Sequence, residues 1–135
     1  MGRLASLRRL SAAERRTLAA AWLLLVIMPV LLRVLPLRRV LTLTRPRGGP
    51  QLPPQRVARL VEIAARRVPS ARCLSVAIVT AWLLARQGTP ATLRIGVARH
   101  AAGLTAHAWL EYDGVPLLDD VGDFTPILAV AVATP

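Results

Sequence analysis

The sequence is poor in the residue types that build disulfides and metal sites. Its 135 residues include one cysteine, Cys73, which excludes an intramolecular disulfide. With only two histidines beside that cysteine, a structural zinc site rich in cysteine or histidine is excluded as well. We therefore expect no metal and no cofactor. Aromatic residues make up 4% of the chain, so platforms on which nucleic-acid bases could stack are scarce.

Lysine is absent, and all eighteen basic residues are arginine. Residues 1–100 hold every arginine and two acidic residues, which gives a net charge of +16. Residues 101–135 hold no arginine and five acidic residues, a net charge of −5. An arginine excess can attract nucleic acid, an anionic membrane surface or an acidic protein. Because helix-turn-helix and RNA-binding signatures are missing, we expect no nucleic-acid partner.

The chain is too hydrophobic to be disordered, with 54% hydrophobic residues. Its length suits one domain, or one small domain with an appendage. A segment rich in proline and glycine at 45–54 reads as a linker. We therefore expect an apolar, arginine-rich helical region with its linker over residues 1–50 and a second domain over 51–135. No signal-peptide cleavage site follows the first apolar run, which predicts a cytoplasmic protein.

The N-terminal region has a helical pattern with a clear start signal. Ser11, followed three residues later by Glu14, forms a capping box. Residues 17–32 then carry no charge, but this run is shorter than the roughly 20 residues that span a bilayer, and Pro29 interrupts it. We expect a helix that packs on the protein or on a partner, with a short kinked span as the alternative. Because a basic amphipathic stretch follows, peripheral membrane contact would extend over residues 17–41.

Two helices are predicted in the second region, over 56–67 and 71–86. Ser70 is the expected N-cap of the second helix, and Gly88 its C-terminal stop. Cys73 would then occupy the third helical position, where free backbone N–H groups and the helix dipole favour an anion such as a thiolate. A lone cysteine is more often a small buried residue, so Cys73 becomes a candidate nucleophile only together with a base.

Alternating patterns predict three strands after these helices, over 91–99, 104–112 and 115–119. The order of elements indicates an α+β domain, an antiparallel meander behind one buried helix. His107 lies in the second strand between two alanines, which leave room for a group to approach its imidazole. A nucleophilic cysteine needs such a base, and the base needs a third group that fixes its tautomer. The apolar tail from Pro126 shows no clear period.

Two registers of the last hairpin leave two candidates for that third group. A two-residue loop at Asp113-Gly114 sets His107 opposite Asp120. A three-residue loop sets it opposite Asp119. Because a slip of one residue exchanges the facing side chain, the pattern leaves both carboxylates open.

Four stretches resemble a known family: Cys73-Leu74-Ser75, Ala81-Trp82-Leu83-Leu84, Leu93-Arg94-Ile95-Gly96-Val97 and Ala106-His107-Ala108-Trp109-Leu110-Glu111-Tyr112-Asp113-Gly114. They are similar to the lasso peptide maturation protease, the separate-chain leader peptidase of bacterial gene clusters that make lasso peptides. The apolar, arginine-flanked N-terminal segment is also similar to that of the family. The resemblance therefore extends over most of the chain.

The resemblance implies a transglutaminase-like (papain-like) α+β core, in which the helix carrying the cysteine packs on an antiparallel sheet. It implies a cysteine peptidase with Cys73 as the nucleophile and His107 as the base. Asp119, five residues after the hairpin glycine, is the implied orienting carboxylate, and this spacing agrees with the three-residue loop. Papain-type enzymes also place a glutamine shortly before the cysteine. Gln51 and Gln55 lie far upstream, so the oxyanion donors would include the backbone N–H of Cys73, with the second donor unassigned.

The resemblance also implies partners. The substrate would be a ribosomally made precursor peptide, cut between leader and core. A small leader-binding recognition protein would present it, and an ATP-dependent lasso cyclase would close the ring. Two competing interpretations are an acyl-transferring enzyme with the same triad and a non-catalytic scaffold whose arginine-rich region docks partners or membrane.

Overall fold

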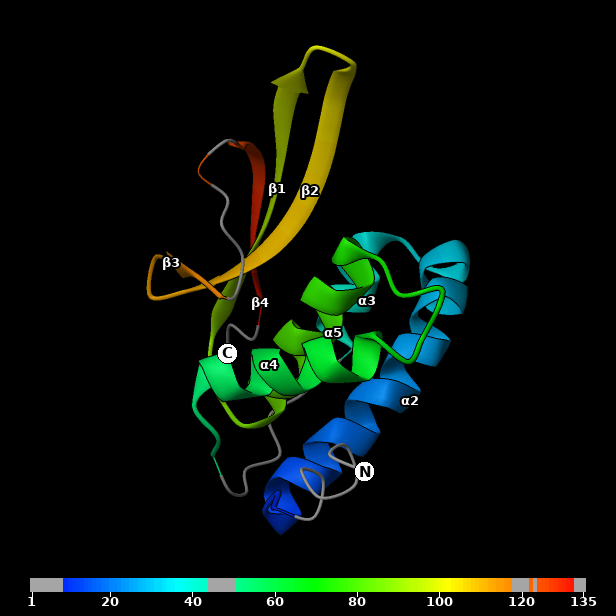
Figure 1. Ribbon diagram of the computed structural model, residues 1–135, viewed down its shortest axis with the longest axis vertical. Helices are drawn as coiled ribbons and strands as arrows, with labels where there is room; N and C mark the ends of the chain where they lie inside the picture. Colours follow the sequence, from blue (N-terminus) through cyan, green and yellow to red (C-terminus); the bar gives the residue numbers. More distant parts are fainter. Residues whose placement is uncertain (1–8, 44–50, 118–121, 123, 133–135) are drawn as a thin grey trace.

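The computed structural model describes residues 9–43, 51–117, 122 and 124–132. Helices gather on one side of a four-stranded antiparallel sheet (Figure 1), so the expected α+β fold class is confirmed. The helices are α2 (Ala12–Val34), α3 (Leu37–Thr42), α4 (Pro54–Ala65) and α5 (Cys73–Arg86). The strands are β1 (Ala91–His100), β2 (Gly103–Tyr112), β3 (Val115–Pro116) and β4 (Thr125–Val132).

The long N-terminal helix begins where the sequence predicts and ends later than the uncharged run. The Ser11 hydroxyl accepts from the Glu14 N–H, and the Glu14 carboxylate accepts from the Ser11 N–H, so the capping box is confirmed. Helix α2 is 23 residues long and continues through Pro29. The arginines at both ends limit the uncharged run but are themselves helical. By length and composition alone, α2 is a helix that could cross a membrane.

One side of α2 belongs to the core of the molecule. Ala21, Leu25 and Met28 are fully buried and join the same apolar cluster as the residues of α4 and α5. Helix α3 is tied to α5 as well, because the Trp82 indole N–H donates to the Val40 carbonyl oxygen at 2.9 Å. Residues on both sides of residue 50 therefore share one core. The division into residues 1–50 and 51–135 stays a prediction about the function of each region.

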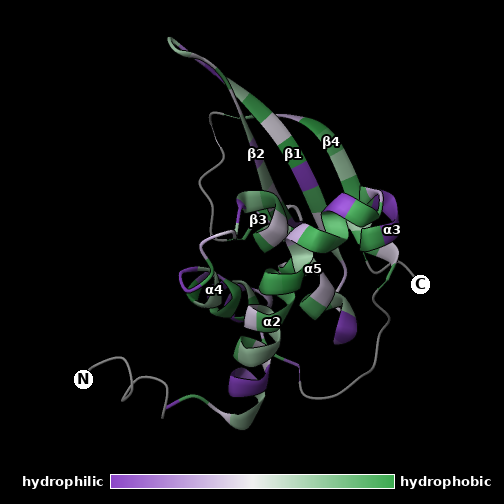
Figure 2. Cartoon of the chain, turned by 90° about the vertical axis from the view of Figure 1, so that its right-hand side faces the viewer, coloured by the Kyte–Doolittle hydropathy of each residue, from purple (hydrophilic) through white to green (hydrophobic). Residues whose placement is uncertain are grey.

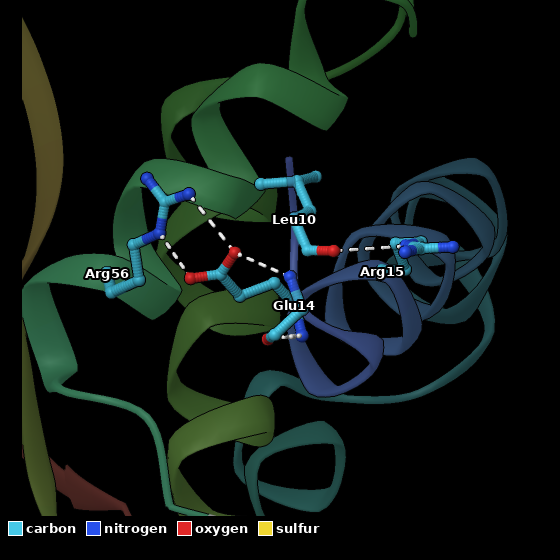
Figure 3. Close-up of polar contacts among 5 residues, drawn as sticks. Leu10, Glu14, Arg15 and Arg56 are labelled. Carbon is cyan, nitrogen blue, oxygen red and sulfur yellow. Dashed lines mark hydrogen bonds and ion pairs between the residues drawn. The ribbon is translucent and has the colours of Figure 1, made fainter. Parts of the chain in front are cut away.

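An ion pair joins the first turn of α2 to α4 (Figure 3). The Arg56 guanidinium donates from Nε to Glu14 Oε1 at 3.1 Å and from Nη2 to Oε2 at 3.4 Å. The hydrogen bond from Arg56, helped by the backbone N–H of Ser11, lowers the pKa of the Glu14 carboxyl below its usual value. Glu14 therefore serves both as a helix cap and as a contact between two segments far apart in the sequence.

We expect Glu14→Gln to destabilise the protein at neutral pH but not in acid. Glutamine can keep the capping contact, so the change isolates the charge that pairs with Arg56. Because the folded-state pKa of Glu14 is lowered, its contribution is present above the unfolded pKa and is lost as pH falls through the folded pKa. Urea unfolding of both proteins at neutral pH and at pH ~3 measures this difference in stability. Curves that differ equally at both pH values would contradict the assignment to charge.

Helix α5 begins two residues later than predicted. The Ala71 N–H closes a turn onto the Val68 carbonyl oxygen at 3.0 Å, and Ser70 lies within that turn. Arg72 is in an extended conformation and is the N-cap. The prediction of Ser70 as the cap is therefore wrong, and Cys73 is the first helical residue rather than the third.

Other helix ends follow local rules. Pro54 is the first residue of α4, where its missing N–H costs nothing, so this helix starts two residues before the predicted position. Gly88 ends α5 with a positive φ of 81°. The Gly88 N–H donates to the Ala85 carbonyl and the Thr89 N–H to the Leu84 carbonyl, the two bonds of a Schellman motif. The predicted stop at Gly88 is confirmed.

The sheet has the strand order β3-β2-β1-β4, with every neighbouring pair antiparallel. The predicted meander forms β1, β2 and β3, although β1 extends one residue beyond its predicted end, to His100, and β3 ends at Pro116 rather than at residue 119. The fourth strand was not predicted, and it pairs with β1 from Ala91 opposite Val132 to Val97 opposite Thr125. Most of β4 is exposed at the edge of the sheet, so its side chains show no alternation between core and solvent.

The hairpin between β2 and β3 has a two-residue loop. Tyr112 pairs with Val115 across Asp113-Gly114, and both loop residues have positive φ, 53° and 79°. Asp-Gly with two positive φ angles is the type I′ turn that suits the twist of a hairpin. The three-residue loop is therefore wrong. Asp119 and Asp120 lie outside the described residues, so the choice between them stays a prediction.

Candidate active site

A cleft of about 140 Å³ is formed by α4, α5 and β2, and two of the three predicted catalytic residues, Cys73 and His107, line it. Cys73 reaches it from the start of α5 and His107 from β2. Most other lining residues are small or apolar, with two polar ones: Ala58, Val76, Ala77, Ala108, Trp109, Leu110 and Leu117, then Glu62 and Thr80. Packing of α5 on β2 thus brings together a thiol and an imidazole that are far apart in the sequence.

Cys73 stands at the exposed end of an otherwise buried helix. Cys73 is exposed to solvent, so the alternative that its side chain fills the core is wrong. The first intrahelical bond runs from the Val76 N–H to the Arg72 carbonyl at 2.9 Å. The N–H groups of the first three helical residues precede this bond, and the Arg72 side chain at the N-cap offers them no acceptor. An anion formed on or beside the thiol would therefore meet the positive end of the helix.

The imidazole of His107 lies against two aromatic rings. Its centroid is 6.1 Å from that of Trp109, with the planes 19° apart, and 5.2 Å from that of Phe124. The two aromatic rings also contact each other, with their centroids 6.2 Å apart. Contacts with both rings restrict the tilt of the imidazole, which a base must hold while it exchanges a proton with the thiol.

Trp109 is itself held in place by polar contacts. It is fully buried, and its indole N–H donates to Glu111 Oε1 at 3.1 Å. Glu111 Oε2 accepts from the Arg94 Nε at 2.6 Å, across from β1. Because alternate residues of a strand share a face, His107, Trp109 and Glu111 follow one another along β2. That shared face agrees with the alternation in the sequence, whereas Phe124 lies in a segment for which the sequence offered no pattern.

Gly96 leaves the space that Trp109 fills. It pairs with His107 across the sheet. A Cβ atom added there would lie 2.6 Å from Trp109 Cη2 and 2.9 Å from the Thr125 carbonyl oxygen. One neighbour is a buried ring and the other is backbone, so neither can move aside easily. The glycine thus allows the ring beside His107 to pack closely on β1.

We expect Gly96→Ala to lower the free energy of unfolding by about 1–3 kcal/mol, the usual range for overpacking a core. It should also lower kcat, because the displaced Trp109 ring packs on His107. Chemical denaturation checks the first effect. Combining it with Trp109→Phe, which removes the clashing ring atoms, should cost less than the sum of the two single changes. Additive costs would show that the clash with Trp109 is not the cause.

Glu62 is a carboxylate of this cleft that the sequence did not single out. It pairs with Arg59 at 3.4 Å and with Arg66 at 3.8 Å along the same face of α4. The helical spacing of Glu62 and Arg66 indicates such a pair. Its position in the cleft depends on how α4 packs beside α5, which no local pattern records.

Neither upstream glutamine lines the cleft in the described part of the chain. The Gln51 side-chain amide donates to the Gln87 carbonyl at 3.1 Å, and Gln87 caps the far end of α5 from Cys73. Gln55 is exposed on α4. The backbone N–H of Cys73 is therefore the expected oxyanion donor, and no glutamine lines the cleft beside it in the described part of the chain.

Comparison with protein families places this cleft in a known context. Residues 4–129 match the family described as the Transglutaminase-like superfamily. No curated protein and no solved structure matches the chain. The family match includes helix α2 together with the elements around the cleft, and members of this superfamily are typically cysteine-dependent enzymes. Since the match covers far more than half of its length, the chain belongs to the transglutaminase-like superfamily.

Proposed function

We propose that this chain is a cysteine peptidase that removes the leader from a ribosomally made lasso peptide precursor. The observation that supports the peptidase chemistry is the shared cleft, with Cys73 at a helix start and His107 on the adjacent strand. The class of substrate comes from the resemblance of the motifs around these two residues to the lasso peptide maturation protease. We place the enzyme in the cytoplasm, with a leader-binding recognition protein and an ATP-dependent cyclase as partners.

In the first step of the proposed reaction, His107 takes the thiol proton, and Cys73 Sγ attacks the carbonyl carbon of the last leader residue. The oxyanion that forms is stabilised by the backbone N–H of Cys73 and by the positive end of α5. His107 then gives its proton to the nitrogen of the first core residue. The C–N bond breaks, the core leaves as a free amine, and the leader stays on Cys73 as a thioester.

In the second step, water replaces the core in the cleft. His107 takes a proton from this water, whose oxygen attacks the thioester carbonyl. The C–S bond breaks, the leader leaves as a carboxylic acid, and the proton on His107 returns to the sulfur. The His107 imidazole keeps one orientation through both steps, because Trp109 and Phe124 pack on it.

Asp119 is the proposed orienting carboxylate of the triad. The two-residue hairpin loop removes the register argument that favoured it. The spacing from Gly114 in the resembling family now supports this choice alone. Asp120 is the alternative, and the Asp119→Asn and Asp120→Asn variants distinguish between them.

Mass spectrometry of a precursor peptide co-expressed with the chain tests this function. We expect a free leader with a carboxyl terminus and a core with a free amino terminus, and uncut precursor when the chain is absent. A leader joined to an amine would show acyl transfer, the alternative chemistry of the superfamily. Uncut precursor with the recognition protein also present would favour the scaffold interpretation.

A further inference from the structure

Helix α2 presents an apolar face to solvent on the side opposite its core contacts. We define the outer face of α2 as Trp22, Leu23, Val26, Ile27, Val30 and Val34, each between 40% and 72% exposed. At 100° per residue these positions fall within one stripe, and the buried side chains lie on the other side of the helix. In Figure 2 most turns of α2 are hydrophobic, with hydrophilic colour near its N-terminal end.

Exposed arginines border the outer face at both of its ends. Arg15 and Arg16 lie two turns before its first residues, and Arg33 lies between its last two. Arg38 and Arg39 of α3 are exposed as well. Within α2 and α3 the only acidic side chain is Glu14, and the Arg56 guanidinium pairs with it. The border of the outer face is therefore positive.

A covering partner must match an apolar stripe and a cationic border at once. A tryptophan and aliphatic side chains between arginines are the composition of helices that lie in the interface of an anionic membrane. The aliphatic residues enter the acyl region, and the guanidinium groups meet lipid phosphates. A helix of 23 residues is about 35 Å long, which gives such a contact a wide footprint.

The opposite side of α2 decides between lying on a membrane and crossing it. Ala21, Leu25 and Met28 are fully buried against the rest of the core, and Glu14 is paired with α4. A spanning helix would have to leave these contacts and expose the cores of α4 and α5. We propose that the outer face of α2 docks on an anionic lipid surface, with the helix parallel to the membrane plane and the folded domain attached.

Sedimentation of the full chain with lipid vesicles tests this docking. We expect binding to vesicles of phosphatidylglycerol and phosphatidylcholine, weaker binding as salt is raised, and little binding to phosphatidylcholine alone. The double variant Val26→Glu/Val30→Glu should lose binding. Its matched control, Leu104→Glu/Val115→Glu, changes two exposed apolar residues of the hairpins by the same charge and should bind as the wild type does.

Arginine variants test the charged border separately. Arg16→Gln/Arg33→Gln should weaken binding by about fivefold for each arginine. The control Arg67→Gln/Arg99→Gln removes the same charge elsewhere on the surface and should have much less effect. Circular dichroism of each variant confirms that it is folded.

Four results would overturn the proposal. The first two are no binding of the folded wild type to anionic vesicles and equal binding to neutral vesicles. The third is a chain that alkaline carbonate does not extract from the vesicles. The fourth is a chain that does not bind vesicles but self-associates, with the association lost in Val26→Glu/Val30→Glu. The third would show a spanning helix and the fourth a second copy on the outer face. None of these measurements depends on Cys73, so the proposed peptidase function is tested independently.

Discussion

We expect Cys73→Ala to abolish leader cleavage and to leave the fold intact. In a serine peptidase the loss of the nucleophile costs on the order of 10⁶-fold in kcat, and we expect cleavage by this variant to fall below detection. The fold should survive, because Cys73 is exposed and its removal creates no cavity in the core. Cys73→Ser should also be inactive, since a hydroxyl is far harder to deprotonate than a thiol.

Cleavage of one precursor by purified variants measures this effect, and thermal unfolding monitors the fold. Ser70→Ala is the matched control, because Ser70 is an exposed residue of the turn before α5 and is not among the residues that line the cleft. It should retain activity. Full activity in Cys73→Ala would remove the nucleophile and with it the peptidase mechanism.

Asp119→Asn is expected to lose on the order of 10²-fold or more in kcat, with little change in substrate binding. Loss of the orienting carboxylate leaves thiol and imidazole in place but frees the tautomer of His107. In a serine protease this change lowers turnover by about 10⁴-fold. A thiol ionises more easily than a hydroxyl, so a cysteine enzyme should suffer less.

Asp120→Asn is the matched control, because it makes the same chemical change at the neighbouring position. It should stay within several-fold of the wild type, and both variants should be assayed side by side on one precursor. A large loss in Asp120→Asn alone would show that the orienting residue follows the two-residue loop of the hairpin. The spacing of the resembling family would then not apply to this chain.

Features encoded by neighbouring residues were predictable from the sequence. The capping box of α2 needs only Ser11 and Glu14, and the end of α5 needs only a glycine that can adopt positive φ. Apolar and polar residues alternate in β1 and β2 because one face of the sheet packs on the helices, whereas the other face carries Trp109 and its neighbours. For the same reason, the sequence placed Cys73 at a helix start and His107 on a strand.

Features decided by competition or by tertiary contacts were not predictable. Ser70 is a good cap by type, but the turn that closes onto Val68 includes it and leaves Arg72 at the start of α5. The tight Asp-Gly turn prevailed over the longer loop, although the sequence allowed both. Strand β4 has few buried side chains, so its pattern contains no signal of the strand that it adds beside β1.

The most direct test of the account is to compare the extent of Cys73 alkylation with cleavage activity. Cys73 is the sole thiol of the chain, so the intact mass after treatment with iodoacetamide reports on this residue alone. We predict that activity on the precursor falls in proportion to the alkylated fraction and reaches zero when every chain carries one adduct. A fully alkylated, folded protein that still separates leader from core would contradict the account.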